Sequence, residues 1–296
     1  MAHSVVYYNA GNRCFRGGLN GQLPKLQEVG KMKLFKLLDA GGASPCFGYQ
    51  WPLPEREGEP GEWTPKIMRV GVFERGYHLV SLEELLDTDG CDLWLAEGRG
   101  RRECDGGIVA FEQARLLRRI EFTAGMLKSY AVWCARTALD ELSLCVPKIE
   151  MLLEYCGEHQ SDRLHLEQLA EAVKDDYIAF ASFDQWRAYK CMSEQYRLRS
   201  YVTEHIYLLG TVLSEVAEMA ELDRPPDARE KMVCRHIHHY AVAVMVGARL
   251  SAAFPEGNIS DAMRAERDRI EPCFLAELGK RLGVKRRRDG WEVSRT

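Results

Sequence analysis

The sequence predicts an α+β protein in which a small β-rich N-terminal module precedes an all-α helical bundle. Between residues 32 and 121, short apolar runs alternate with glycine- and proline-rich turns, a pattern typical of strands. From Thr123 onward the apolar residues recur every three or four positions, which is the spacing of one buried helix face. This change of spacing indicates a boundary near Thr123, and a chain of 296 residues is long enough for two domains.

We therefore divide the chain into four segments. Residues 1–31 are predicted to be an N-terminal extension, 32–122 a small α+β module, 123–283 a helical bundle and 284–296 a basic tail without a pattern of its own. The extension contains several glycines and no continuing periodicity. Met32 opens the first strand-like run and is an alternative start for the protein.

Within the module the apolar runs predict strands at 32–38, 67–73, 93–96, 108–111 and 114–120. The proline- and glutamate-rich stretch 51–65 predicts a solvated loop, and Gly98–Gly107 predicts a charged turn. Ser81 and Glu84 have the spacing of a capping box, so we expect a short helix to begin at Ser81.

The helical part shows two clear apolar stripes. Every third or fourth residue is apolar in the stripe Leu127, Ala131, Cys134, Ala138 and Leu142, and again in the stripe Val233, Ile237, Tyr240, Val244 and Ala248. Asp227 and Glu230 resemble a capping box, Ser260 or Asp261 is the expected cap of the last helix, and Gly283 is the expected end. Pro272 predicts a break or a new first turn within that helix.

Composition excludes several classes of protein. The formal charge of −4 argues against binding to nucleic acid or anionic membranes over the whole surface. No run approaches the roughly 18 apolar residues that span a membrane, and the first 30 residues lack the apolar segment of a secretory signal. The ten cysteines contain no CxxC pair, so a reducing cytoplasm with structural cysteines is predicted.

Three stretches resemble a known group of proteins. Residues 74–78 (ERGYH) and 105–118 (DGGIVAFEQARLLR) are similar to the N-terminal module of uncharacterised phage and bacterial proteins, which carries a Gly-aromatic-His motif. Residues 130–139 (YAVWCARTAL) are similar to the start of their helical region, which also resembles a family named as immunity proteins. The resemblance implies a two-part architecture and a phage or prophage setting in a bacterial host cell, and it implies no established reaction.

His78 is the leading candidate for catalysis. A Gly-Tyr-His corner beside Arg75 could present an imidazole and a cation to a phosphate or a ribose, and Glu97 or Glu112 could orient a sugar hydroxyl. That set would suit a nucleotide- or NAD-dependent transferase of the ADP-ribosyltransferase kind. The alternative is that His78 braces a turn, with Gly76 present for its backbone freedom.

A cluster at 234–239 is the candidate metal site. On a helix, Cys234 and His238 lie one turn apart, as do His236 and His239, so either pair could chelate an ion. The alternative is a partly buried histidine with ordinary hydrogen bonds. The sequence contains no Glu-x-x-His, which a ferritin-like di-metal site requires.

Two surfaces are candidates for binding partners. The aromatic residues Trp186, Tyr189, Tyr196 and Tyr201 either pack in the core or form a face for a protein partner. The basic run Lys285, Arg286, Arg287 and Arg288 is the one candidate for nucleic-acid contact, against the alternative that it complements a helix end.

These observations favour a non-catalytic protein-interaction protein of phage or prophage type, with an immunity or host-modulating role. The rival hypothesis is the nucleotide- or NAD-dependent transferase centred on His78, and a third is a metal-binding bundle. The sequence names no cofactor.

Overall fold

The protein is a mixed α+β structure. A computed structural model describes residues 29–56, 58–72, 74–143, 223–252, 258–287 and 290–293, together with single positions between 201 and 219. In chain order the elements are β1 (Val29–Leu38), β2 (Tyr77–Val80), the 3₁₀ turn η1 (Leu85–Asp87), β3 (Asp92–Asp105), β4 (Ile108–Ile120), α1 (Ala124–Ser143), α6 (Ala228–Ala252), α7 (Ile259–Arg281), β5 (Val284–Arg287) and β6 (Gly290–Val293).

The strands form one sheet in the order β2-β4-β3-β1-β6-β5. An additional pairing of Phe35 with Val80 joins β1 to β2, so that β1, β3, β4 and β2 close on themselves. The closed strands enclose their own apolar cluster: Leu34, Leu38, Trp51, Tyr77, Leu79, Ala96, Val109, Phe111, Ala114 and Leu116. Because side chains alternate along a strand, the intervening residues Phe35 and Leu37 lie on the other face, toward the helices.

The predicted turn at Gly98–Gly107 is wrong, because β3 continues through it to Asp105. The glycines are needed for close packing instead. A side chain at Gly98 would lie 2.4 Å from the ring of Phe111, and Gly100 has a φ of +82° beneath the carboxylate of Glu112. The register of β3 against β4 shifts between Arg99 and Arg102, which marks a bulge that bends the strand over the cluster.

Two further predictions in the module are wrong. Residues 67–73 form no strand among their described positions, and only an isolated bridge joins Gly71 to Arg75. The expected helix at Ser81 is reduced to the single turn η1, whose N-cap Glu84 makes no side-chain capping bond. The backbone N–H of Ser81 donates instead to the Gly107 carbonyl at 2.7 Å. Ser81 thus extends the pairing of β2 with β4 and does not start a helix.

The helix predictions near residues 123 and 227 are confirmed. Thr123 accepts a hydrogen bond from the Met126 N–H at 3.1 Å and caps α1. Asp227 and Glu230 form the reciprocal capping box: the Glu230 N–H donates to Asp227 Oδ1 at 2.8 Å, and the Asp227 N–H donates to Glu230 Oε2 at 2.9 Å. Arg224 adds an ion pair to Glu230 at 2.7 Å.

Both predicted stripes are buried where their side chains are described, except that Tyr240 is only partly buried. Leu127, Ala131, Cys134 and Ala138 of α1, and Val233, Ile237, Val244 and Ala248 of α6, belong to one large core. In α7 the cap is Asn258, whose side chain accepts from the Ser260 N–H, and the helix continues through Pro272 without a break. Gly283 ends it with a φ of +64°.

The segment expected to be a basic tail without structure forms a β-hairpin. β5 pairs with β6 antiparallel, and β6 joins the edge of β1 in parallel at Lys33 and Gly290. The Trp291 ring lies 5.5 Å from the Phe35 ring, centroid to centroid. The end of the chain therefore returns to the first strand, which sequence periodicity could not show because each strand has only four residues.

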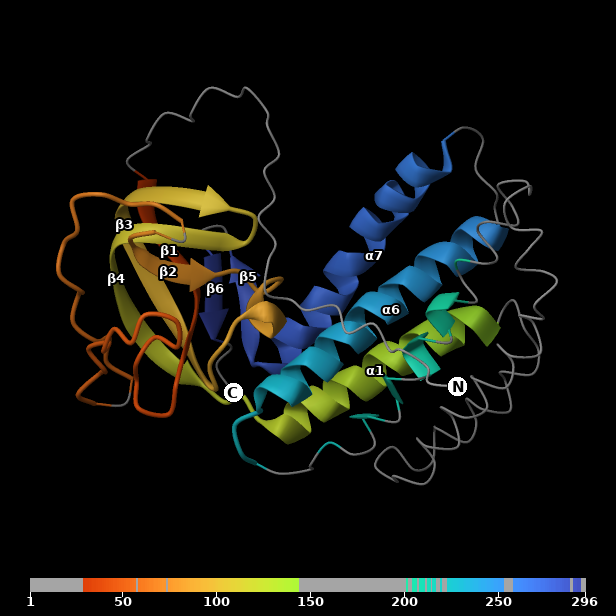
Figure 1. Cartoon of the computed structure of the whole chain (residues 1–296), viewed down its shortest axis with the longest axis horizontal. Helices are drawn as coiled ribbons and strands as arrows, with labels where there is room; N and C mark the ends of the chain where they lie inside the picture. The colour runs from red at the N-terminus through yellow and green to blue at the C-terminus, as the bar shows by residue number, and fades with distance from the viewer. Residues whose placement is uncertain are drawn as a thin grey trace, which may run out of the picture.

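Figure 1 shows the strands gathered on one side and α1, α6 and α7 side by side on the other, with η1 and the β5–β6 hairpin between them. The Lys231 ammonium of α6 donates to the carbonyls of Thr88 at 2.6 Å and Gly90 at 2.7 Å, and Arg235 forms an ion pair with Asp87. These contacts attach α6 to the turn that follows β2.

Residues 144–200 lie outside the described residues, so the prediction that 123–283 are wholly helical stays a prediction. Among the positions described between 201 and 219, Leu209, Leu213 and Val216 are fully buried. No described helix combines the length and the apolar character that a membrane span requires.

The hairpin contact can be tested with Trp291→Ala. We expect this change to lower the free energy of unfolding by about 2 kcal/mol, because it removes a half-buried aromatic ring from the core between β1 and α7. Chemical denaturation measures the loss. The control is Met68→Ala, at a side chain that is 76% exposed, where little change is expected. Equal stability of Trp291→Ala and the wild type would contradict this role of the hairpin.

Candidate metal centre

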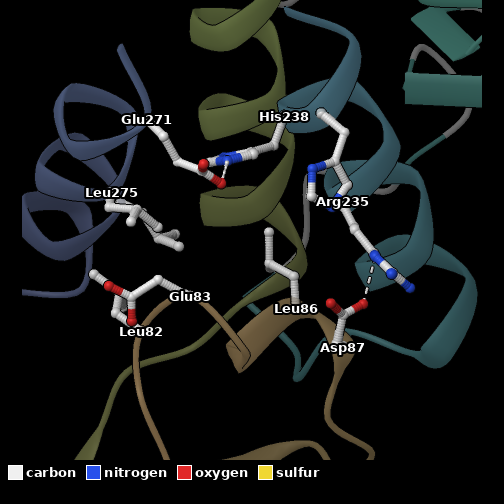
Figure 2. A pocket seen from close by; sticks show the side chains of 10 residues that line it. Leu82, Glu83, Leu86, Asp87, Arg235, His238, Glu271 and Leu275 are labelled. Carbon is white, nitrogen blue, oxygen red and sulfur yellow. Dashed lines mark ion pairs between the residues drawn. The ribbon is translucent and has the colours of Figure 1, made fainter. Parts of the chain in front are cut away.

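A small pocket lies where η1 meets α6 and α7. It is lined by Leu82, Glu83, Leu86, Asp87, Arg235, His238, His239, Glu271, Leu275 and Leu278. Its volume is about 20 Å³, which is enough for one water molecule or one ion and for nothing larger. Figure 2 shows the Glu271 side chain of α7 pointing at the His238 ring of α6, with the leucines below them.

Local sequence determines which residues face this pocket. The capping box at Asp227 fixes where α6 begins, and Lys231, Arg235 and His238 then follow at intervals of four and three. Since Lys231 and Arg235 bind the segment around η1, His238 comes next on the same side of the helix. Glu271 belongs to the middle of α7, which packs along α6.

His238 is buried, with 5% of its surface exposed, and Tyr130 contacts its ring on the Nδ1 side. The Tyr130 hydroxyl lies 2.7 Å from His238 Nδ1 and 3.2 Å from the Phe274 carbonyl oxygen. A carbonyl can only accept, and the hydroxyl has one proton. The arrangement that satisfies both contacts has Tyr130 donating to Phe274 and accepting from Nδ1–H of His238, which leaves the lone pair of His238 on Nε2.

That lone pair faces a carboxylate. His238 Nε2 and Glu271 Oε1 are 3.8 Å apart, which is too long for a direct hydrogen bond. A positive charge on His238 lowers the pKa of Glu271 more than burial raises it, so Glu271 is a carboxylate when a cation, either a proton on Nε2 or another ion, lies between the two side chains. A lone pair and a negative charge facing each other are stabilised by a cation between them, either a proton on Nε2 or a metal ion.

His239 supplies a third donor. A ligand nitrogen of His239, one of His238 and a carboxylate oxygen of Glu271 all lie within 4.8 Å of one another. Burial, the neighbouring His238 and then Arg235 lower the pKa of His239 to about 4. Its ring is therefore neutral at pH 7, which is the state that binds metal.

The three residues match a known donor set. Two imidazoles and one carboxylate are a common set for zinc, with Zn–N and Zn–O distances of about 2.0–2.2 Å. Two donors on one tetrahedral ion are then roughly 3.3–3.5 Å apart. The separation of 3.8 Å between His238 and Glu271 is close to this value, and the three donor atoms lie within 4.8 Å of one another, so the side chains would have to move closer together to hold an ion.

Arg235 also lines the pocket, and a cation there would oppose a metal ion. Its guanidinium turns away from Glu271 and forms an ion pair with Asp87, as Figure 2 shows. The Asp87 carboxylate offsets most of the positive charge of Arg235. Because the guanidinium points toward Asp87, it also leaves the space between His238 and Glu271 unfilled.

The structure brings together two of the four predicted ligands, and adds Glu271. Cys234 is fully buried, its thiol lies 3.7 Å from the Leu127 carbonyl, and burial raises its pKa well above the usual range. It is therefore a protonated core residue. His236 stacks on Tyr240 at 5.9 Å between ring centroids. Neither Cys234 nor His236 belongs to the cluster. The two predicted pairs, Cys234 with His238 and His236 with His239, are therefore replaced by the adjacent residues His238 and His239 together with Glu271.

The predicted catalytic residues lie on the sheet. His78 is half-buried on β2, and its ring stacks on Phe47 at 6.1 Å. Burial and the nearby Lys36 lower the pKa of His78, against a hydrogen bond to the backbone of Gly71 that raises it. Arg75 is exposed and bridges to Gly71. Gly76 has a φ of +146°, which agrees with the interpretation of a turn that needs glycine.

Both predicted acids are buried in ion pairs. Glu97 accepts from Arg115 at 2.8 Å. Glu112 accepts from Arg101 at 3.3 Å and lies 3.4 Å from the Lys66 ammonium. Burial raises the pKa of Glu112, but the bonds from Arg101 and the charge of Lys66 outweigh it, so that the pKa lies below the usual range. Each carboxylate is thus held by a cation of its own sheet.

Of the predicted partner-binding aromatics, Trp186, Tyr189 and Tyr196 lie outside the described residues. Tyr201 is half-buried, and its carbonyl lies 2.7 Å from His205 Nδ1. In the basic run, Lys285 and Arg286 are exposed on β5, Arg287 ends that strand and Arg288 lies outside the described residues.

No protein-family model, curated protein or solved structure matches this chain. The resemblance to phage proteins and immunity proteins therefore stays a prediction.

Cys234 can be separated from the metal centre by chemical labelling. We expect iodoacetamide to modify Cys46, Cys104 and Cys273, which are exposed, and to leave Cys134 and Cys234 unmodified in the native protein. Peptide mass spectrometry measures the labelling. Protection should persist in the presence of EDTA, because packing and not a metal ion covers the thiol. Rapid labelling of Cys234 once the chelator is added would contradict this account and return the residue to the ligand set.

Proposed function

We propose that this protein binds one divalent transition-metal ion, of the zinc class, through His238, His239 and Glu271. The observation that carries the proposal is the position of the buried His238, whose Nδ1 contacts the Tyr130 hydroxyl and whose Nε2 faces the Glu271 carboxylate, with the His239 imidazole within reach. The Tyr130 hydroxyl behind His238 has the position of the hydrogen-bond partner that orients a metal-binding histidine.

The ion has a structural role in this proposal. Catalytic zinc sites keep a fourth position open to substrate, whereas this pocket, with four leucines in its lining, has room for one ion and for nothing larger. The ligands come from two helices, α6 and α7, and the pocket is closed by η1. An ion there would tie the two helices together at the point where they meet the sheet.

A structural ion implies no reaction, and so it agrees with the wider hypothesis of a non-catalytic interaction protein. In that hypothesis residues 123–283 are an all-α bundle that binds a protein partner in the cytoplasm of a bacterial host, in a phage-related or immunity role. Its support is the sequence resemblance described above.

The metal proposal is tested with matched variants. We expect the wild type to bind zinc, and zinc at about a hundredfold excess over its dissociation constant to stabilise the fold by about 2.7 kcal/mol. His239→Gln and Glu271→Gln should each weaken binding by roughly tenfold or more, because each removes one ligand. Calorimetric titration of the metal-free protein and thermal unfolding measure the two effects.

The controls are His236→Gln, one turn away on the same helix, and Glu83→Gln, which lines the pocket but does not belong to the ligand cluster. Both should bind zinc as the wild type does. Zinc binding lost equally in His236→Gln and His239→Gln, or a wild type that binds no zinc, would rule out the proposed centre.

One observation keeps the transferase hypothesis as a second candidate. Burial lowers the pKa of Lys36 to about 8, and this ammonium lies near His78, so two perturbed titratable groups neighbour each other. The contacts of His78 with Phe47 and Gly71 favour a bracing role instead.

His78→Ala decides between these two roles. We expect it to lower the free energy of unfolding by about 1 kcal/mol, the cost of one hydrogen bond and a ring contact, and to leave binding of NAD or ATP unaltered. Arg75→Ala, at an exposed residue of the same corner, is the control and should leave stability unchanged. Unchanged stability of His78→Ala together with lost nucleotide binding would favour the transferase.

A further inference from the structure

A second, larger hollow lies at the C-terminal end of α7, and its lining shares no residue with the pocket of the candidate metal centre. It is lined by Arg118, Arg119, Ile120, Glu121, Thr123, Met126, Lys280, Arg281, Leu282, Gly283 and Val293. Its volume is about 550 Å³, within the range of about 300–1,000 Å³ that small-molecule sites occupy. The end of β4, the start of α1, the end of α7 and β6 meet there.

The lining is positively charged. It contains four cationic side chains, Arg118, Arg119, Lys280 and Arg281, and one carboxylate, Glu121. The start of α1 and the end of α7 both reach the hollow, and because helix dipoles carry opposite signs at these ends they offset each other. The side chains therefore decide the sign of the potential.

The cations differ in their availability. Arg118 is exposed and has no ion-pair partner among the residues that the structure describes. Arg119 pairs with Asp92 at 2.6 Å, and Lys280 and Arg281 pair with Glu277 at 3.4 and 3.0 Å. The side chains of Arg119 and Lys280 are 64% and 79% exposed, whereas their partners Asp92 and Glu277 are only 18% and 16% exposed. Arg118 is therefore the cation most available to an anion, and the other three add positive charge beside it.

Four of the other lining residues are apolar. Ile120 and Leu282 are buried, and Met126 and Val293 are partly buried and pack on the core. A ligand that fills this hollow would therefore have an anionic part for the arginines and an apolar or flat part for this floor. Arginine is the side chain that best fits phosphate, because its planar group can donate two parallel hydrogen bonds.

We propose that the hollow binds a nucleoside polyphosphate, with its phosphates on Arg118 and the neighbouring cations and its base against Met126 and Val293. This site is separate from the metal centre and from His78, so the inference stands independently of the proposed function.

Titration of the full-length protein at low salt tests the proposal, with pyrophosphate, ATP and adenosine as probes. We expect ATP to bind more tightly than pyrophosphate, because the base covers the apolar floor, and adenosine to bind weakest. Arg118→Ala should weaken ATP binding about tenfold, the effect of one lost charge-assisted contact, and Arg118→Lys should recover part of the loss.

The control is Arg264→Ala, at an exposed arginine on the same helix α7 that does not line the hollow. If the phosphates of ATP acted only by removing a bound metal ion, the titrations of Arg118→Ala and Arg264→Ala would change by the same amount. A difference in ATP affinity between the two variants therefore reports binding in the hollow. The proposal is overturned if the wild type binds no ATP at millimolar concentrations or if both variants weaken it equally. A single-stranded oligonucleotide that binds where ATP does not would also overturn it.

Discussion

The attachment of α6 to the turn after β2 is the interaction on which the rest of the structure depends. A buried lysine, Lys231, donates to two backbone carbonyls of that turn, and Arg235 binds Asp87 one helical turn later. Bonds from a charged donor contribute about 1.5–3 kcal/mol each, and the carbonyls would otherwise lose their partners. Together they fix the rotation of α6 about its axis, and this rotation turns His238 and His239 toward Glu271 and the pocket.

The same attachment explains why sheet and helices share one core. The large apolar cluster contains Phe35 and Leu93 from the strands, Leu127 from α1 and Phe274 from α7. After α7 the chain returns to this core as the β5–β6 hairpin, which places Trp291 against Phe35. The candidate metal centre lies beside this core, between α6 and α7, with His238 buried and His239 and Glu271 partly exposed.

Features fixed by neighbours in sequence could be predicted, and features fixed by distant contacts could not. The capping box at Asp227 and the stripe from Val233 to Ala248 are local, and both are confirmed. The glycines of β3 were misinterpreted as a turn, because a glycine that admits the Phe111 ring looks the same in sequence as one that bends the chain. His238 and His239 were found by residue type, but Glu271, more than thirty residues away, carries no local signal that assigns it to them.

The central claim is that a metal ion, and not a proton, lies between His238 and Glu271. Diffraction data collected at the zinc absorption edge, from crystals grown with zinc, test it most directly. The account predicts one anomalous peak about 2.0–2.2 Å from His238 Nε2, a His239 nitrogen and a Glu271 oxygen. A map without a peak there, and with Nε2 of His238 drawn into a direct hydrogen bond with Glu271, would show that a proton fills the site and would contradict the account.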